Sequence, residues 1–227
     1  MEYNRCVIIT AGLEDDFPNL DWFPEINPDD YIICADGGYR ICKMAGKRPH
    51  VVIGDFDSLS EELVEELETL SIERVIYPKD KDDTDTFLCV GYALARGFDR
   101  FVLAGGIGGD FGHTMANVQT LSYLTDMGCE AEIVTGHERL IMAEGENARE
   151  NGETIAAKPV TVRGKPGGRF SVLSYTERSS GVCIDNAKYE LSDAVLTHSR
   201  PVGVSNEFTG DGRVVISVRE GRLLIVL

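Results

Sequence analysis

The feature that most constrains this chain is a change of rhythm near residue 136. Before it, short apolar runs alternate with segments whose apolar residues recur at helical spacing. The runs are rich in Val and Ile, and most are apolar throughout, as strands buried on both faces should be. They are Cys6–Thr10, Tyr31–Ala35, Val51–Ile53, Arg74–Tyr77, Phe101–Ala104 and Ala131–Val134. This alternation predicts an α/β sandwich domain with a mainly parallel sheet over residues 1–136.

Helices are expected between these strands. Ser58 followed by Glu61 is a capping-box pattern, which predicts a helix that begins there. A second helix should begin at Thr84 or Asp85, and a third should run from about His113.

After residue 136 no helical pattern is convincing. The expected strands are Val160–Arg163, Arg169–Leu173, Arg213–Val218 and Leu223–Leu227. Turn clusters separate them, such as Gly164–Gly168, Ser179–Gly181 and Gly210–Gly212. The pattern predicts an all-β domain, an antiparallel β-sandwich, over residues 137–227. Arg139–Ala143 could belong to either half.

Composition limits the partners. The formal net charge is -16, which argues against nucleic acid as a partner, because binding a phosphate backbone needs clustered Lys and Arg. No apolar run approaches the roughly 20 residues of a membrane span, and the first residues lack the pattern of a secretory signal. The six cysteines form no C-x-x-C pair, which favours reduced, buried thiols in a cytoplasmic protein over a zinc site.

Unusual polar chemistry follows four successive strands of the first half. The loops are Asp36–Gly38, Gly54–Ser58, Pro78–Asp85 and Gly105–His113. Parallel α/β sheets bind ligands beyond the carboxyl ends of their strands. We therefore expect these loops to converge on one edge of the sheet.

Carboxylates are concentrated in two of these loops. Asp55 and Asp57 are two residues apart and face the same way in an extended chain, while Asp82 and Asp85 are neighbours at a helix start. Mg²⁺ commonly binds one or two carboxylates together with waters and substrate phosphates, and it would relieve the repulsion between them. Taken singly, Asp80, Asp83 and Asp110 fit solvated turn residues or helix caps better.

The glycines Gly105, Gly106, Gly108 and Gly109 precede the third expected helix. Such a loop lets backbone N–H groups approach phosphate oxygens. Its spacing is neither G-x-G-x-x-G nor G-x-x-x-x-G-K-[ST], so the phosphates must be held in another way, consistent with a site of aspartates and metal.

The motifs ADGG, GDFDS, KDDTD, GGIGGDFGHTMAN and VSNEF, in this order and spacing, resemble those of thiamine pyrophosphokinases. The resemblance covers nearly the whole chain. It implies a homodimeric enzyme that transfers diphosphate from ATP to the hydroxyl group of thiamine. It also implies that ATP and Mg²⁺ bind the N-terminal domain. Thiamine would bind a cleft at the dimer interface, touched by the C-terminal domain of the partner.

Site residues follow from the resemblance, motif by motif. Asp55, Asp57 and Asp85 would be catalytic and hold the metal and polyphosphate, with Asp82 as a further metal contributor. The ATP site would comprise Asp36, Gly37, Gly105, Gly106, Gly108, Gly109, His113 and Asn117. For thiamine, Ser205 and Asn206 would bind the aminopyrimidine, and Phe208 would form an aromatic wall.

One departure from the family stands out. The family usually reads GGR-x-DH, whereas Asp110 and Gly112 occupy the positions of its Arg and Asp here. Three alternatives stay open: a diphosphokinase acting on a pterin alcohol, a non-catalytic thiamine or nucleotide binder, and a haloacid-dehalogenase-like phosphatase. The Asp55-Phe56-Asp57 segment suggests the last of these weakly, because the residues after it do not fit that family.

Overall fold

A computed structural model describes residues 3–11, 20, 23–148, 154–155 and 157–227. Its internal contacts divide the chain into two compact units, Met1–Glu138 and Arg139–Leu227, called unit 1 and unit 2 below. The division lies close to the change of rhythm at residue 136. Among the described residues, no helix is both long enough and apolar enough to cross a membrane.

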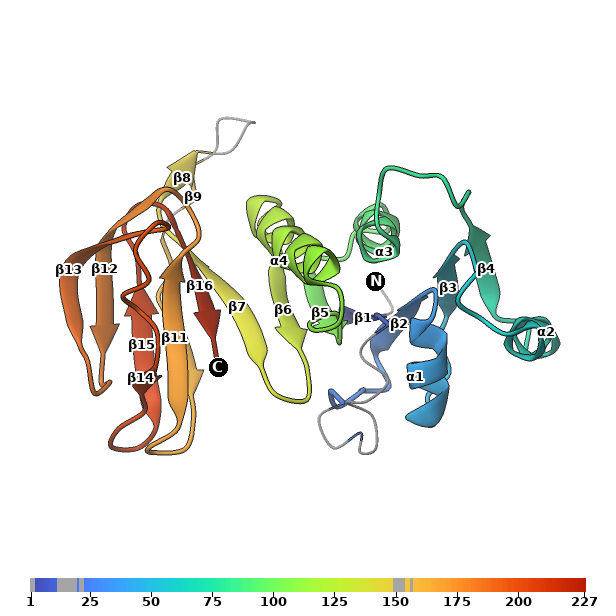
Figure 1. The fold of residues 1–227 in the computed structure, drawn as a ribbon, viewed down its shortest axis with the longest axis horizontal. Coiled ribbons are helices and arrows are strands. Elements are labelled where there is room, and N and C mark those ends of the chain that lie inside the picture. The colour runs from blue at the N-terminus through green and yellow to red at the C-terminus, as the bar shows by residue number, and fades with distance from the viewer. Residues whose placement is uncertain (1–2, 12–19, 21–22, 149–153, 156) are drawn as a thin grey trace. The chain divides into compact units, whose positions relative to one another are not determined.

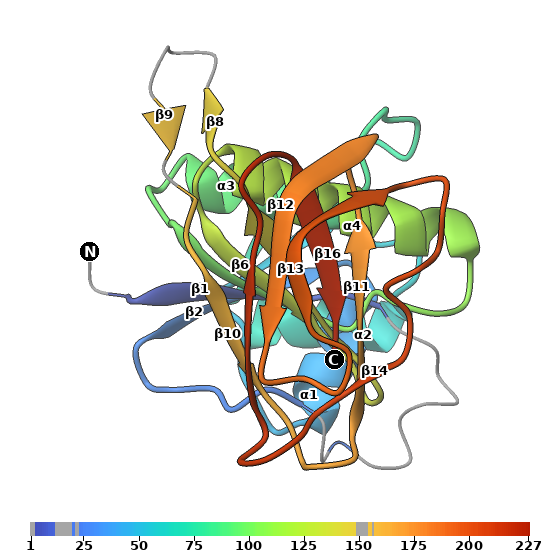
Figure 2. The ribbon, with the colours of Figure 1, turned by 90° about the vertical axis from the view of Figure 1, so that its left-hand side faces the viewer.

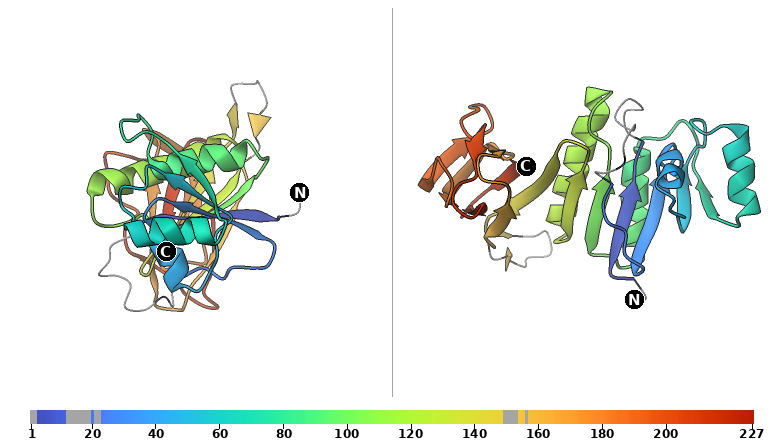
Figure 3. Two further views of the ribbon diagram at one scale, coloured as in Figure 1. Left: turned by 90° about the vertical axis from the view of Figure 1, so that its right-hand side faces the viewer. Right: turned by 90° about the horizontal axis from the view of Figure 1, so that it is seen from below.

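The centre of unit 1 is a parallel sheet with the strand order β6-β5-β1-β2-β3-β4 (Figure 3). Its strands are β1 (Arg5–Ile9), β2 (Asp30–Ala35), β3 (Val51–Gly54), β4 (Glu73–Ile76), β5 (Arg100–Ala104) and β6 (Glu130–Val134). The central strands are buried along almost their whole length. This burial is the reason that their sequences are apolar throughout rather than alternating.

Helices cover both faces of this sheet. They are α1 (Gly38–Met44), α2 (Glu61–Thr69), α3 (Asp85–Leu94) and α4 (Phe111–Asp126). In Figure 1, α1 and α2 lie on one face, and α3 and α4 on the other. The strand order explains this, because the chain moves one way from β1 to β4 and the other way from β5 to β6, and right-handed crossovers then place the helices on opposite faces.

The helix starts differ in detail from the sequence prediction. The cap of α2 is Ser60, whose side chain accepts a hydrogen bond from the backbone N–H of Leu63, so the predicted start at Ser58 was wrong by two residues. Ser60 places two glutamates in the first turn, where the helix dipole favours negative charge. Thr84 is the cap of α3, and α4 begins after Asp110. The seven-residue helix α1 was missed because it opens with glycine and spans about two turns.

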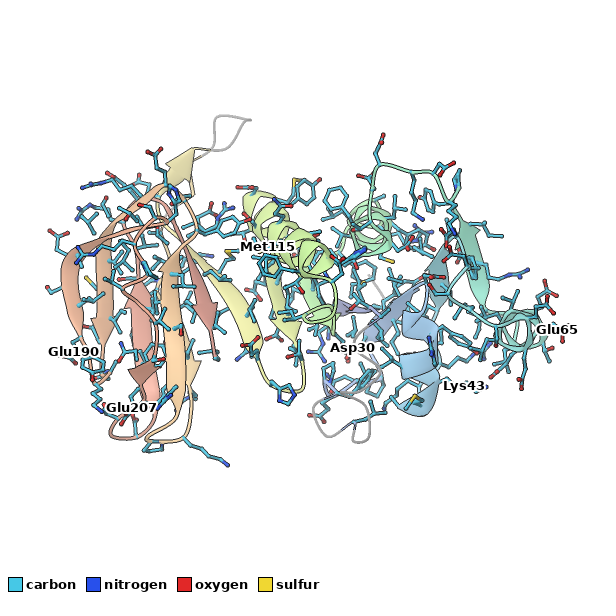
Figure 4. The ribbon with its side chains drawn as sticks, viewed as in Figure 1. Asp30, Lys43, Glu65, Met115, Glu190 and Glu207 are labelled. Atoms are coloured by element: carbon cyan, nitrogen blue, oxygen red, sulfur yellow. The ribbon has the colours of Figure 1, made fainter. Side chains whose placement is uncertain are left out.

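An ion pair joins the first two strands where they begin. Arg5 donates from Nε to Asp30 Oδ1 at 2.7 Å and from Nη2 to Oδ2 at 2.9 Å, and the Asn27 N–H also donates to Oδ2. The Asp30 side chain is only 1% exposed. Figure 4 labels this residue. Burial alone would raise the pKa of Asp30, but the hydrogen bonds from Arg5 and Asn27 outweigh it and hold this pKa below its ordinary value.

Replacing Asp30 by Asn is expected to lower the free energy of unfolding by about 1.5–3 kcal/mol, the usual contribution of hydrogen bonds to a charged group. Because the folded-state pKa is depressed, this contribution is complete above about pH 4 and is lost as the pH falls further. Denaturant titrations of both proteins across this pH range test the prediction. A difference that stays constant below pH 4 would contradict it.

Unit 2 contains two antiparallel sheets, with the strand orders β14-β11-β16-β7 and β10-β15-β12-β13 (Figures 1 and 2). Their strands are β7 (Arg139–Glu144), β10 (Val160–Arg163), β11 (Arg169–Ser174), β12 (Arg178–Asp185), β13 (Leu191–Thr197), β14 (Asn206–Glu207), β15 (Arg213–Ser217) and β16 (Arg222–Val226). A short pair, β8 (Asn147–Ala148) and β9 (Thr154–Ile155), lies apart from both sheets. Buried side chains from both sheets form one core. The predicted combination of a parallel α/β domain and a β-sandwich is confirmed.

One predicted turn is part of a strand. Ser179–Gly181 lies inside β12, although its composition is that of a turn. Gly181 has φ +66°, and the pairing of β12 with β13 shifts register between Ser180 and Val182. The glycine therefore marks a bulge, where one strand carries an extra residue, rather than a chain reversal.

Candidate active site

The loops of unit 1 surround a cavity of about 560 Å³ at the carboxyl edge of the parallel sheet. Thr10, just after β1, and Gly106, just after β5, both line it. These two strands are neighbours at the point where the strand order reverses. Open α/β sheets bind ligands at such a point.

Most residues predicted for the nucleotide site, and two of those predicted for the metal, line this cavity. The polar ones that line it are Asp36, Asp82, Asp85, His113 and Asn117. The glycines that line it are Gly37, Gly106, Gly108 and Gly109. The loops after β2, β4 and β5 therefore meet, as expected from the topology, together with Ser58 from the loop after β3.

Three aspartates next to the cavity bring their carboxylates together. Each of Asp36, Asp55 and Asp57 offers one oxygen, and these oxygens lie within 4.8 Å of one another. We call them the three-aspartate group. Asp36 follows β2, and the other two follow β3, its neighbour in the sheet.

Asp36 is held in an unusual backbone conformation. Its φ is +40°, a left-handed value that aspartate tolerates better than most residues. Its N–H donates to the carbonyl oxygen of Ile53 at 2.8 Å, which ties the end of β2 to β3. A Cβ on Gly54 would lie 2.8 Å from the Cβ of Asp36. Glycine at position 54 thus allows β3 to approach the aspartate closely.

The three-aspartate group suits a hard divalent cation. Asp36 is only 6% exposed, and its Oδ1 has no hydrogen-bond partner among the described residues. Burial raises the pKa of Asp36, and the charges of Asp85 and Asp55 raise it further, against a hydrogen bond from Ser58. A buried carboxylate oxygen without a partner, close to two other carboxylates, has the donor chemistry that Mg²⁺ binds.

Two lysines that sequence reasoning missed pair with these carboxylates. Lys79 forms an ion pair with Asp57, and its hydrogen bond lowers the pKa of that aspartate. The Nζ of Lys81 lies 2.9 Å from Asp85 Oδ1 and 3.7 Å from Asp55 Oδ2. Their place in the loop that follows β4 was the available signal, because parallel α/β sheets bind ligands beyond the carboxyl ends of their strands.

The three-aspartate group differs from the predicted metal set. Asp36, expected near the nucleotide, joins Asp55 and Asp57. Among the described residues, Asp82 and Asp85 are not members of this group. Asp85 begins α3 and is paired with Lys81, and Asp82 is exposed at the cavity. The neighbouring strands explain why Asp36 joins the group and Asp85 does not. Asp36 follows β2, which is hydrogen-bonded to β3, whereas Asp85 lies in the first turn of a helix.

The loop that contains Gly105, Gly106, Gly108 and Gly109, called the glycine loop below, is held by side chains of α4. Asn117 donates from Nδ2 to the carbonyl oxygen of Gly106 at 2.7 Å, and Thr114 Oγ1 accepts from the N–H of Gly108 at 3.0 Å. A Cβ on Gly106 would lie 2.6 Å from Asn117 Nδ2. Gly105 directly precedes Gly106, and a Cβ added to Gly105 would lie 3.1 Å from Thr10 Oγ1. Asn117 thus positions the loop as well as lining the cavity.

The departure at positions 110 and 112 has a local explanation. Asp110 caps α4, because its Oδ1 accepts a hydrogen bond from the His113 N–H at 3.1 Å. A Cβ on Gly112 would lie 2.9 Å from that same Oδ1. The glycine therefore leaves room for the cap. The His113 side chain is exposed at the mouth of the cavity.

The residues predicted for thiamine lie in unit 2. Ser205 is exposed with φ +59°, and its N–H donates to Ser171 Oγ. Asn206 is buried and exchanges hydrogen bonds with the backbone N–H and carbonyl oxygen of Tyr189 at 3.0 and 2.8 Å. Asn206 thus fixes the chain around β14.

Phe208 corrects one expectation. It is 3% exposed, its ring centroid lies 4.7 Å from that of Phe170, and a Cβ on Gly164 would collide with its ring at 2.3 Å. A side chain packed on all sides in the core of unit 2 leaves no face for an aromatic wall of a binding site.

Comparisons with known proteins agree with this arrangement. Residues 24–133 match the family model "Thiamin pyrophosphokinase, catalytic domain", and residues 160–223 match "Thiamin pyrophosphokinase, vitamin B1 binding domain". Thiamine pyrophosphokinase of Bacillus subtilis is 24% identical over 219 residues, covering 96% of each chain. Thiamin pyrophosphokinase 1 of Caenorhabditis elegans is 25% identical over 169 residues, covering 71% of this chain and 63%, less than two thirds, of that relative.

Solved structures share the fold. The crystal structure of the Bacillus subtilis thiamine pyrophosphokinase has a TM-score of 0.82 at 20% identity, covering 98% of this chain and 97% of that chain. The yeast thiamin pyrophosphokinase has a TM-score of 0.72 at 15% identity, covering 100% and 86%. The two family models together match more than half of the sequence. This chain belongs to the thiamin pyrophosphokinase family.

Proposed function

We propose that this protein is a thiamine pyrophosphokinase that transfers a diphosphoryl group from ATP to the hydroxyl group of thiamine. The observation that carries the proposal is the cavity of unit 1, which is lined by Asp36 of the three-aspartate group, by two lysines and by a glycine loop. The segment matching the family's catalytic domain contains all of these residues.

In the proposed reaction the thiamine hydroxyl oxygen attacks the β-phosphorus of ATP. The bond between that phosphorus and the oxygen bridging to the α-phosphorus breaks, and AMP leaves. Reactions of this class depend on alignment and charge neutralisation more than on covalent chemistry by the protein. The site offers both, because its carboxylates lie just after the neighbouring strands β2 and β3 and at the start of α3, and two ammonium groups pair with them.

Mg²⁺ dependence is part of the proposal. Asp36, Asp55 and Asp57 would hold the ion, and Asp85 lies close enough to raise the pKa of Asp36 through its charge. A bound Mg²⁺ would supply charge neutralisation at the phosphate oxygens. Lys79 and Lys81 would add positive charge, and Gly106, Gly108 and Gly109, which line the cavity, would lie beside the polyphosphate.

Unit 2 would provide contacts to thiamine, as its match to the vitamin B1 binding domain supports. Ser205 and Asn206 remain our candidates there. The homodimer inferred from the family resemblance stays a prediction. So does a cytoplasmic location, which the six free cysteines favour.

Incubation of the protein with ATP, Mg²⁺ and thiamine tests the function. Thiamine diphosphate and AMP should appear in equal amounts and only with the metal. Calorimetry with thiamine distinguishes the alternatives if neither forms, since binding without turnover would indicate a non-catalytic binder. Absence of thiamine binding would favour a pterin alcohol as the substrate.

A further inference from the structure

Lys81 occupies a position that a simple surface ion pair does not explain. Its side chain is 14% exposed and lines the cavity. Its Nζ lies between carboxylates of two different elements, Asp55 after β3 and Asp85 at the start of α3. Lys79, only two residues away, pairs with Asp57 but is 74% exposed. A charge with so little solvent around it interacts with its neighbours more strongly than an exposed one.

Asp55 is shared between two competing cations. It belongs to the three-aspartate group, which suits a divalent ion, and it is also within 4 Å of the Lys81 ammonium group. Asp36 has no such counter-charge among the ion pairs described, and its Oδ1 has no hydrogen-bond partner there. A divalent ion beside Asp55 would be repelled by the ammonium group if Lys81 stayed where it is.

A negatively charged ligand in the cavity would change this balance. Lys81 has a flexible four-carbon stem, and an ammonium group is a good point-charge partner for phosphate. If the ammonium group moved to a phosphate oxygen, Asp55 would lose its pairing with Lys81 and could bind the metal. Asp85 would stay near both the ammonium group and the metal.

We propose that Lys81 couples metal binding to polyphosphate binding in this protein. In the free chain it neutralises Asp55 and Asp85 and weakens metal binding. When a nucleoside triphosphate enters, Lys81 moves its ammonium group to the polyphosphate, and the three-aspartate group then binds the metal tightly. The metal thus binds productively together with its nucleotide rather than alone. This inference rests on the proposed function, since it assumes a polyphosphate substrate in the cavity.

The proposal predicts effects of opposite sign for one substitution. In Lys81→Gln, Mn²⁺ alone should bind more tightly, by about 5- to 150-fold, the usual range of coupling between two sites. In the same variant, α,β-methylene-ATP should bind more weakly at saturating Mn²⁺, by about 10-fold or more, as the loss of one charged hydrogen bond implies. A lysine with a purely structural role would not tighten metal binding when removed.

The experiment measures free Mn²⁺ by electron paramagnetic resonance during titration of each protein, with and without α,β-methylene-ATP. Lys81→Arg keeps the charge and should retain weak Mn²⁺ binding in the absence of nucleotide. Lys43→Gln is the matched control, because Lys43 lies on α1 (Figure 4), pairs with Glu66 and changes the net charge equally. Lys81→Met serves if the Gln variant does not fold.

Unchanged or weaker Mn²⁺ binding in a folded, charge-neutral Lys81 variant would overturn the proposal. The wild-type assay for thiamine diphosphate separates this failure from failure of the proposed function. Product formation together with unchanged Mn²⁺ affinity in Lys81→Gln rejects the coupling alone. Absence of product together with tightened Mn²⁺ binding rejects the substrate assignment and keeps the competition between lysine and metal.

Discussion

Replacing Asp55 by Asn is expected to lower kcat for thiamine diphosphate formation by about 10²- to 10³-fold, the usual loss when one group that stabilises transition-state charge is removed. Asp55 belongs to the three-aspartate group and also lies within 4 Å of the Lys81 ammonium group, so its charge acts on both the proposed metal site and that lysine. Asparagine keeps the side-chain shape and can still accept the hydrogen bond from the Asp57 N–H.

The fold should survive this change. Asp55 raises the pKa of Asp36 through its charge, so a neutral side chain relieves repulsion in the folded protein. The measurement is steady-state kinetics at saturating Mg²⁺, with thermal unfolding as the check on folding. Asp80→Asn is the control, because Asp80 is exposed in the same part of the chain and outside the three-aspartate group. Near-normal turnover by Asp55→Asn would remove the group from the catalytic site.

The second large effect concerns stability. Gly38→Ala is expected to lower the free energy of unfolding by about 3 kcal/mol, because the new Cβ would lie 2.1 Å from the backbone oxygen of Ile9 and 2.8 Å from its carbonyl carbon. Neither atom belongs to a flexible side chain, so β1 or α1 must move. Because Gly38 follows Asp36 and Gly37, which line the cavity, the shift should also reduce activity.

Gly91→Ala is the matched control for this substitution. Gly91 lies inside α3, and nothing is within 4 Å of its added Cβ. Alanine there should raise the free energy of unfolding by about 0.5–1 kcal/mol through helix propensity and reduced entropy of the unfolded chain. Denaturant titrations of the two variants should therefore move in opposite directions. A Gly38→Ala protein as stable as wild type would show that the approach of α1 to β1 can relax easily.

The sequence was sufficient to predict the elements that bury large apolar runs, because burial on both faces leaves a continuous pattern. It also predicted the meeting of the polar loops, since strand polarity alone brings carboxyl ends to one edge. Turn chemistry was less reliable. The glycine and serines of Ser179–Gly181 are typical of turns, but pairing with β13 on one side and a bridge from Ser180 to Glu220 on the other keep the segment in β12.

Side-chain partners in the site were harder to predict. The resemblance implied a metal set of Asp55, Asp57, Asp85 and Asp82, whereas the carboxylates that meet in the structure are those of Asp36, Asp55 and Asp57, with Asp36 just after the neighbouring strand β2. That pairing depends on strand order, which the sequence pattern does not specify. Phe208 was misjudged for a similar reason, because only the packing against Phe170 and Gly164 shows it to be a core residue.

The cap of α4 makes two positions dependent on each other. A Cβ at position 112 would lie 2.9 Å from the Asp110 oxygen that receives the His113 N–H, so that oxygen must shift and the cap is weakened. The cap, worth about 1 kcal/mol, can be lost only once, so the second of the two changes carries no further penalty. A lineage that first replaces Gly112 loses the reason to retain Asp110, and one that first replaces Asp110 no longer needs the glycine. Both routes therefore end at the same pair of residues with the same total loss of stability, because that loss depends on the pair and not on the order of the changes.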